Sequence, residues 1–282
     1  MGEIEFESTD CEVGRVPFFI SNSEHYNKIF VAIRGSYTFA DFLTDLTANA
    51  TAVEDGLVHS GVYQASNALI VRAESLLLQM QEKHGGREIV FTGHSLGGGV
   101  AGMTAWMMRK RHPGMKASAV CFAPAASFSA DLWEESKGFI RSFYIGGDPV
   151  PFMSLHNVAQ ISQKGLPSAV SKIVQEAVTR DVSQPLRLPF GYDPDFNPFA
   201  EEPPSREKIV ADLRRRTRRT TALFPPGAMV HICLIGGAFL RAHLERIEDS
   251  IVHFGQFVKG IDEKHHSSDL YVESFDELIS KA

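Results

Sequence analysis

The sequence predicts an α/β fold in which a mainly parallel central sheet carries helices on both faces. Short, apolar, β-branched segments alternate along the chain with longer segments of helical character, and this alternation is typical of a parallel sheet covered by helices. A second observation is that the apolar segment 88–92 leads directly into Gly93-His94-Ser95-Leu96-Gly97 and then into a segment rich in small residues. That order is typical of a strand, a sharp turn and a closely packed helix.

The composition is that of an ordinary globular domain. The chain has 282 residues, of which 44% are hydrophobic and 22% are charged, so we expect one domain over residues 1–282. The net charge of −6 gives no general attraction to nucleic acid, and no apolar run is long enough to cross a bilayer. Three scattered cysteines favour neither a disulfide framework nor a zinc site. Because the first six residues also lack the order of a signal peptide, we expect a cytoplasmic protein.

Apolar periodicity places the individual elements. Strands are expected over residues 16–20 and 29–33, followed by a helix from 61 to 84 that Gly85 and Gly86 end. After the segment around Ser95, strands are expected over 116–122, 139–145 and 230–235, and a last helix over 270–280. Between residues 154 and 224 the pattern is irregular, apart from a short helix for which Ser205 is a candidate cap.

Ser95 is the candidate nucleophile. The flanking Gly93 and Gly97 allow a sharp turn that would place its side chain at the tip of the preceding strand. The backbone N–H of Leu96, at the start of the following helix, can then meet an oxyanion. Gly-x-Ser-x-Gly occurs by chance in many chains, but the strand before it and the helix after it favour a functional role.

A serine hydroxyl needs a base, and the base needs a group that holds it in the right tautomer. Asp148 follows the strand 139–145 and precedes Pro149, which suits the carboxylate, although Gly-Asp-Pro is also ordinary turn chemistry. The base is expected later still, which gives the Ser, Asp, His order of α/β-hydrolases. His265 and His266 lie there. Only one of them can face Ser95, and both could instead belong to a solvated loop.

Several short segments resemble the class 3 lipase family, and most of all its diacylglycerol lipase branch. They occur in the family's order over roughly residues 16 to 275, which is nearly the whole chain. The resemblance implies an α/β-hydrolase fold and a serine lipase that hydrolyses acylglycerol esters, di- or monoacylglycerols above all, through an acyl-enzyme. The substrate would then lie at a membrane or droplet surface. The matching segments are Val31–Ser36, Asp41–Leu46, Val58–Gly61, Gly93–Gly99, Phe122–Pro124, Ser142–Phe143, Gly147–Leu155 and Leu223–Gly227.

The resemblance also implies roles for single residues. Ser95 matches the nucleophile and Asp148 the acid of the triad. Ser36 matches the small hydroxyl residue whose N–H forms one half of the oxyanion hole, and Leu96 supplies the other half. We expect no metal and no organic cofactor, because a triad and an oxyanion hole together supply the nucleophile, the base and the stabilisation of charge.

The base is assigned by its spacing from a tyrosine. In the family the catalytic histidine follows an aspartate and precedes a tyrosine by five residues. His266 precedes Tyr271 by five, whereas His265 stands where the aspartate would be. We therefore assign the base to His266 rather than to His265. His59 and His94 match positions that we interpret as packed or capping histidines.

Residues 155–223 fall where the diacylglycerol lipase branch carries a variable insertion. This stretch includes a basic cluster against few acids, which is either a solvated face or a peripheral contact with anionic membrane. Other readings of the whole chain stay open: a phospholipase A1, a broad carboxylesterase, or a catalytically inactive lipid-binding homologue. The arginines of the cluster are Arg214, Arg215, Arg216, Arg218 and Arg219.

Overall fold

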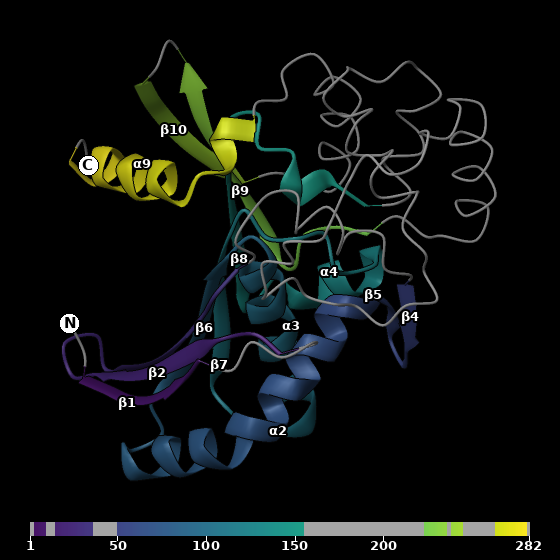
Figure 1. Cartoon of the computed structure of the whole chain (residues 1–282), viewed down its shortest axis with the longest axis vertical. Coiled ribbons are helices and arrows are strands. Elements are labelled where there is room, and N and C mark those ends of the chain that lie inside the picture. The colour runs from purple at the N-terminus through teal and green to yellow at the C-terminus, as the bar shows by residue number, and fades with distance from the viewer. Residues whose placement is uncertain are drawn as a thin grey trace, which may run out of the picture.

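A twisted sheet of eight strands forms the centre of the part of the chain that the computed structural model describes, residues 3–9, 15–35, 50–154, 223–235, 238–244 and 263–280 (Figure 1). Its strand order is β1-β2-β3-β6-β7-β8-β9-β10, and β4 and β5 form a separate hairpin. The elements follow one another along the chain as β1 (Glu3–Ser8), β2 (Phe18–Ser23), β3 (Lys28–Ile33), β4 (Ala50–Val53), β5 (Gly56–His59), α2 (Ser60–Lys83), β6 (Glu88–His94), α3 (Leu96–Arg111), β7 (Ala117–Phe122), α4 (Ala130–Ser136), β8 (Ile140–Ile145), η1 (Val150–Phe152), β9 (Ala228–Ile235), β10 (Ala238–Leu244), η2 (Glu263–His266) and α9 (Ser268–Ser280).

The middle of the sheet is parallel. Strands β3, β6, β7, β8 and β9 pair in parallel with one another, while β1, β2 and β10 add antiparallel edges. Helices cover both faces of such a parallel sheet, which agrees with the continuous apolar runs Ile29–Ile33 in β3 and Ile89–Phe91 in β6. All the carboxyl ends of these five strands meet at one edge of the sheet, and in α/β folds ligands bind there.

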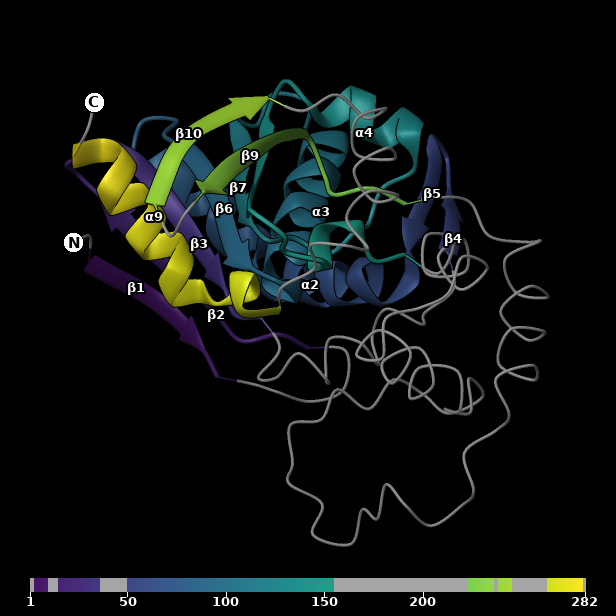
Figure 2. The same ribbon diagram turned by 90° about the horizontal axis from the view of Figure 1, so that it is seen from above.

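Helices cover both faces. On one face α2 and α3 pack over alternate side chains of the sheet, such as Ile89, Phe91 and Cys121. On the other face α9 covers a smaller cluster that includes Phe122, Ile145 and Ile232, and Figure 2 shows α9 on the opposite side of the sheet from α2 and α3. The alternation within β7, with Cys121 facing α3 and Phe122 facing α9, follows from the two-residue period of a strand.

The predicted fold class, a mainly parallel sheet with helices on both faces, is confirmed. Three features were not predicted from the sequence: β1, although its residues alternate between polar and apolar, the β4–β5 hairpin, whose strands have only four residues each, and β10. Most of the expected insertion, including Ser205, lies outside the described residues, and the single-domain assignment over residues 1–282 stays a prediction. Among the described helices, none combines the length and apolar character needed to span a bilayer.

Candidate active site

Ser95 occupies a sharp turn between β6 and α3. Its backbone has φ 60° and ψ −128°, a conformation that residues with a side chain rarely adopt and that often marks a functional site. The turn is fixed from both sides, because Ser95 N donates to Phe122 O at 2.9 Å and Gly99 N donates to Ser95 O at 3.1 Å. A Cβ on Gly93 would lie 2.5 Å from the carbonyl carbon and oxygen of Gly97, so this turn requires glycine.

The amide of Leu96 opens α3. As the first residue of the helix, its N–H has no acceptor one turn earlier within the helix, and it lies at the positive end of the helix dipole. The end of β3 approaches the same place, since a Cβ on Gly35 would lie 2.5 Å from His94 O. Ser36, the other predicted oxyanion-hole residue, comes directly after Gly35 but lies outside the described residues, as does the segment Asp41–Leu46 that resembles class 3 lipases.

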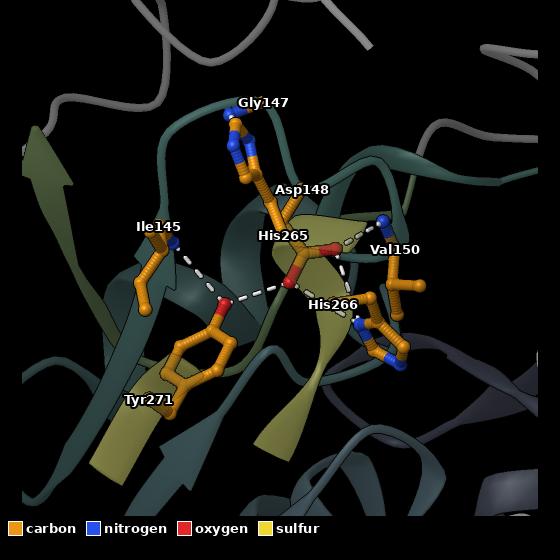
Figure 3. A network of polar contacts seen from close by, with 7 residues as sticks. All are labelled: Ile145, Gly147, Asp148, Val150, His265, His266 and Tyr271. Carbon is orange, nitrogen blue, oxygen red and sulfur yellow. Dashed lines mark hydrogen bonds and ion pairs between the residues drawn. The ribbon is translucent and has the colours of Figure 1, made fainter. Parts of the chain in front are cut away.

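Asp148 is fully buried at the end of β8. Its carboxylate accepts three hydrogen bonds (Figure 3): from Val150 N at 3.0 Å, from Tyr271 Oη at 2.7 Å, and from His266 Nδ1, which lies 3.1 Å from Oδ1 and 3.2 Å from Oδ2. A buried carboxylate is stable only when hydrogen bonds replace its lost hydration. These three donors come from η1, α9 and η2, so the site depends on tertiary structure.

His266 is thus the histidine that faces the acid. Since a carboxylate is an acceptor, His266 Nδ1 carries the hydrogen in the neutral ring, and Nε2 is left as the basic nitrogen. The His266 ring also packs against the ring of His94, the residue before Ser95, with 4.6 Å between centroids. This contact places His266 beside the strand end from which Ser95 emerges.

The neighbouring His265 contacts the backbone of the acid loop and not the carboxylate. Its Nδ1 accepts a hydrogen bond from Gly147 N at 2.8 Å, so it is bound to the loop that carries Asp148, and Figure 3 shows the two rings directed to different parts of that loop. The structure therefore brings His266, and not His265, to the carboxylate.

Burial shifts the pKa values of two residues that contact Asp148 or His266, namely His94 and Tyr271. The pKa of His94 is lowered to about 4, mainly because burial disfavours the charged ring and further because His266 lies beside it. The pKa of Tyr271 is well above its ordinary value, because the phenol is buried and because its ionised form would face Asp148. His94 is therefore neutral at physiological pH, and Tyr271 is a hydrogen-bond donor.

Tyr271 is the part of the site that the sequence did not reveal as functional. Besides its bond to Asp148, its Oη accepts from Ile145 N at 3.1 Å, and it thereby joins α9 to the end of β8. One indication of its role is present in the sequence, the spacing of five residues between His266 and Tyr271. That spacing was used only to choose between His265 and His266.

His59 is a capping histidine. Its Nδ1 accepts from Val62 N at 3.3 Å at the start of α2, in agreement with a structural rather than a basic role. The basic cluster Arg214–Arg219 lies outside the described residues, and its contact with membrane stays a prediction. Within the described ranges, no group of three or more His, Cys, Asp or Glu residues could hold a metal ion.

The mainly parallel sheet with helices on both faces, and the sharp turn that carries Ser95 between β6 and α3, are those of an α/β-hydrolase fold. Comparison with known proteins agrees with this: residues 30–158 match the model of class 3 lipases, so the resemblance that the sequence indicates is confirmed.

Two relatives are diacylglycerol lipases. The chain is 25% identical to rat diacylglycerol lipase-alpha over 265 residues, which cover 82% of this chain and 24% of that protein. It is 30% identical to mouse diacylglycerol lipase-beta over 161 residues, which cover 54% of this chain and 24% of that protein. The chain thus spans about a quarter of the length of these relatives. Among solved structures, the Rhizomucor miehei triacylglyceride lipase superposes with a TM-score of 0.50 at 18% identity, over 54% of this chain and 60% of that one, which shows a shared fold.

Proposed function

We propose that this protein is a serine lipase in which Ser95, His266 and Asp148 form the catalytic triad. The observation that carries the proposal is the geometry at the carboxyl ends of β6 and β8. There Ser95 holds the positive-φ turn before α3, and His266 Nδ1 lies against a buried carboxylate.

The expected reaction is acyl transfer in two steps. Ser95 Oγ attacks the ester carbonyl carbon and passes its proton to His266 Nε2, while Asp148 stabilises the resulting imidazolium. The C–O bond to the alcohol then breaks, and His266 returns the proton to the departing alcohol. Water attacks the acyl-enzyme by the same route, which releases the fatty acid and restores Ser95.

The oxyanion hole would consist of the N–H groups of Leu96 and Ser36. Leu96 is the first residue of α3, and a helix N-terminus stabilises the negative charge that forms on the carbonyl oxygen. For Ser36 the proposal rests on the resemblance to class 3 lipases and on the close approach of Gly35 to the turn at Ser95.

The proposed substrates are acylglycerols, with di- and monoacylglycerols first. The names of the two relatives support this choice. Phospholipase A1 or broad carboxylesterase activity would use the same catalytic groups, because selection among lipid esters depends on pocket walls and not on the triad.

A substrate panel tests the proposal. Mono-, di- and triacylglycerols and phosphatidylcholine, each in mixed micelles, are incubated with the wild-type protein and with Ser95→Ala. We expect fatty-acid release from di- and monoacylglycerol by the wild type and none by Ser95→Ala. Release from phosphatidylcholine alone would assign a phospholipase, and absence of release from every ester would favour a lipid-binding homologue.

A further inference from the structure

We infer that His265 is a positioning residue whose neutral imidazole holds the loop of Asp148 in place, so that protonation of His265 loosens the site independently of protonation of the base. The inference rests on the proposed function and deepens it, since it assigns a second histidine to the control of the same site.

The two adjacent histidines take opposite tautomers. Gly147 N donates to His265 Nδ1 at 2.8 Å, and because a backbone N–H can only donate, Nδ1 of His265 must be bare. In the neutral ring of His265 the hydrogen is then on Nε2. His266 Nδ1 faces the Asp148 carboxylate at 3.1 Å and must carry its hydrogen there.

The bond to His265 completes the backbone hydrogen bonding of the acid loop. Gly146 N donates to Ile232 O at 2.9 Å and Asp148 N donates to Ile145 O at 3.0 Å. Gly147 N, between them, donates to the His265 side chain. The loop turns sharply, with Gly146 at φ 46°, so the His265 ring anchors the backbone one residue before the buried carboxylate.

Protonation removes this anchor. A proton on His265 Nδ1 would place two N–H groups against each other, at Gly147 and at the ring, and the hydrogen bond would be lost. Of the residues that the structure describes, the charged and titratable groups around the pair are the Asp148 carboxylate, His266 and the exposed Lys264 on the same 3₁₀ helix, Tyr271 on α9, and His94 on β6. Asp148 would attract a cationic His265, but this attraction does not restore an acceptor for Gly147 N.

The consequence is a steep loss of activity on acidification. In the pH range where imidazoles take up protons, a single catalytic base gives a limb in which log kcat/KM changes by one per pH unit. Loss of the anchor on top of protonation of the base makes the limb steeper than one, by up to about half a unit if the lost hydrogen bond costs five- to tenfold in activity. His94 adds no step in that range, because its pKa is about 4.

The test compares His265→Asn with His265→Ala. The Asn side-chain oxygen can take the place of Nδ1 as the acceptor for Gly147 N, and it does not titrate. We expect His265→Asn to keep kcat near neutral pH within about twofold and to reduce the acid-limb slope to one. We expect His265→Ala to lower kcat about five- to tenfold near neutral pH, the loss of one neutral hydrogen bond, with little change in KM, and to approach the wild type at acidic pH, where the wild type has lost the same bond. An acid limb in His265→Asn as steep as that of the wild type, or wild-type kinetics in His265→Ala at neutral pH, would overturn the inference.

A second measurement does not depend on catalysis. In ¹⁵N-labelled protein, neutral His265 should show the Nε2–H tautomer, and the Gly147 amide signal should shift with the same midpoint as the His265 ring. In His265→Asn that amide shift should vanish. If Gly147 follows His266 instead, or if His265 carries its hydrogen on Nδ1, the anchor is disproved whether or not any ester is cleaved. Loss of hydrolysis in Ser95→Ala, by contrast, concerns only the proposed function.

Discussion

His266 Nδ1 lies 3.1 Å from Asp148 Oδ1, although 118 positions of the chain separate the two residues. The contact joins the 3₁₀ helix η2 to the end of β8, and it requires the central sheet, the acid loop and the C-terminal helix to be in place together. The candidate site is therefore a tertiary arrangement, and each of its contacts can be tested separately.

The first prediction concerns the two histidines. His266→Ala removes the group that accepts the Ser95 proton, so kcat should fall by several orders of magnitude, on the order of 10³ or more. His265→Ala should lose far less. Steady-state hydrolysis of a soluble short-chain ester measures both variants, and the opposite ranking would assign the base to His265.

The second prediction concerns the phenol on Asp148. Tyr271→Phe removes a donor at 2.7 Å from a buried carboxylate, which makes the carboxylate more basic and a better partner for the imidazolium. The midpoint of the acid limb of kcat/KM should therefore rise, by about half a pH unit. Because Tyr271 also joins α9 to the end of β8, Tyr271→Phe holds the carboxylate less firmly, and kcat should fall about tenfold. Phe275→Leu is the matched control, because Phe275 packs against Phe122 and Phe143 from the same helix. That variant should lower stability without moving the midpoint.

The third prediction concerns the turn at Ser95. Gly93→Ala would place a Cβ 2.5 Å from the carbonyl group of Gly97, so β6 and α3 must separate and Ser95 must move. We expect a loss of stability of about 1–3 kcal/mol and a larger loss of hydrolysis. Gly114→Ala is the control, since no atom lies within 4 Å of its added Cβ. Thermal unfolding and hydrolysis of both variants give the comparison, and an active Gly93→Ala would argue against a tight turn.

The fourth prediction concerns stability against pH. The pKa of His94 is about 4 in the folded protein and about 6.5 in an unfolded chain. Between these values the unfolded chain binds the proton and the folded protein does not, so the free energy of unfolding decreases as the pH falls from about 6.5 to about 4. The His94 contribution is about 3 kcal/mol at most.

His94→Gln has no group that titrates in this range. Urea denaturation at pH 7, 5 and 4 should therefore show a weaker pH dependence for His94→Gln than for the wild type. Identical pH dependence in the two proteins would mean that burial does not lower the pKa of His94.

The sequence predicted the parallel core of the fold because strands buried on both faces must be apolar and β-branched. It missed the β4–β5 hairpin because backbone pairing between Thr51 and Val58 needs no apolar pattern. It also missed β1, whose acidic residues lie at the edge of the sheet.

The residues of the candidate site also divide into those that the sequence predicts and those that it does not. Ser95 and Asp148 were predictable because strand ends and glycines mark them in the sequence. His265 and His266 could not be separated by chemistry, since adjacent residues of one type differ only in where the 3₁₀ helix directs them. Tyr271 required the packing of α9 against the sheet, which no local pattern contains.

The most direct test of the central claim is covalent labelling of the wild-type protein with a fluorophosphonate, followed by peptide mass spectrometry. An activated serine attacks the phosphorus, whereas an ordinary buried hydroxyl does not. We expect stoichiometric modification of Ser95, and slow labelling or none at Ser95 in His266→Ala. Absence of the label from Ser95 in folded wild-type protein, or labelling that does not depend on His266, would contradict the triad.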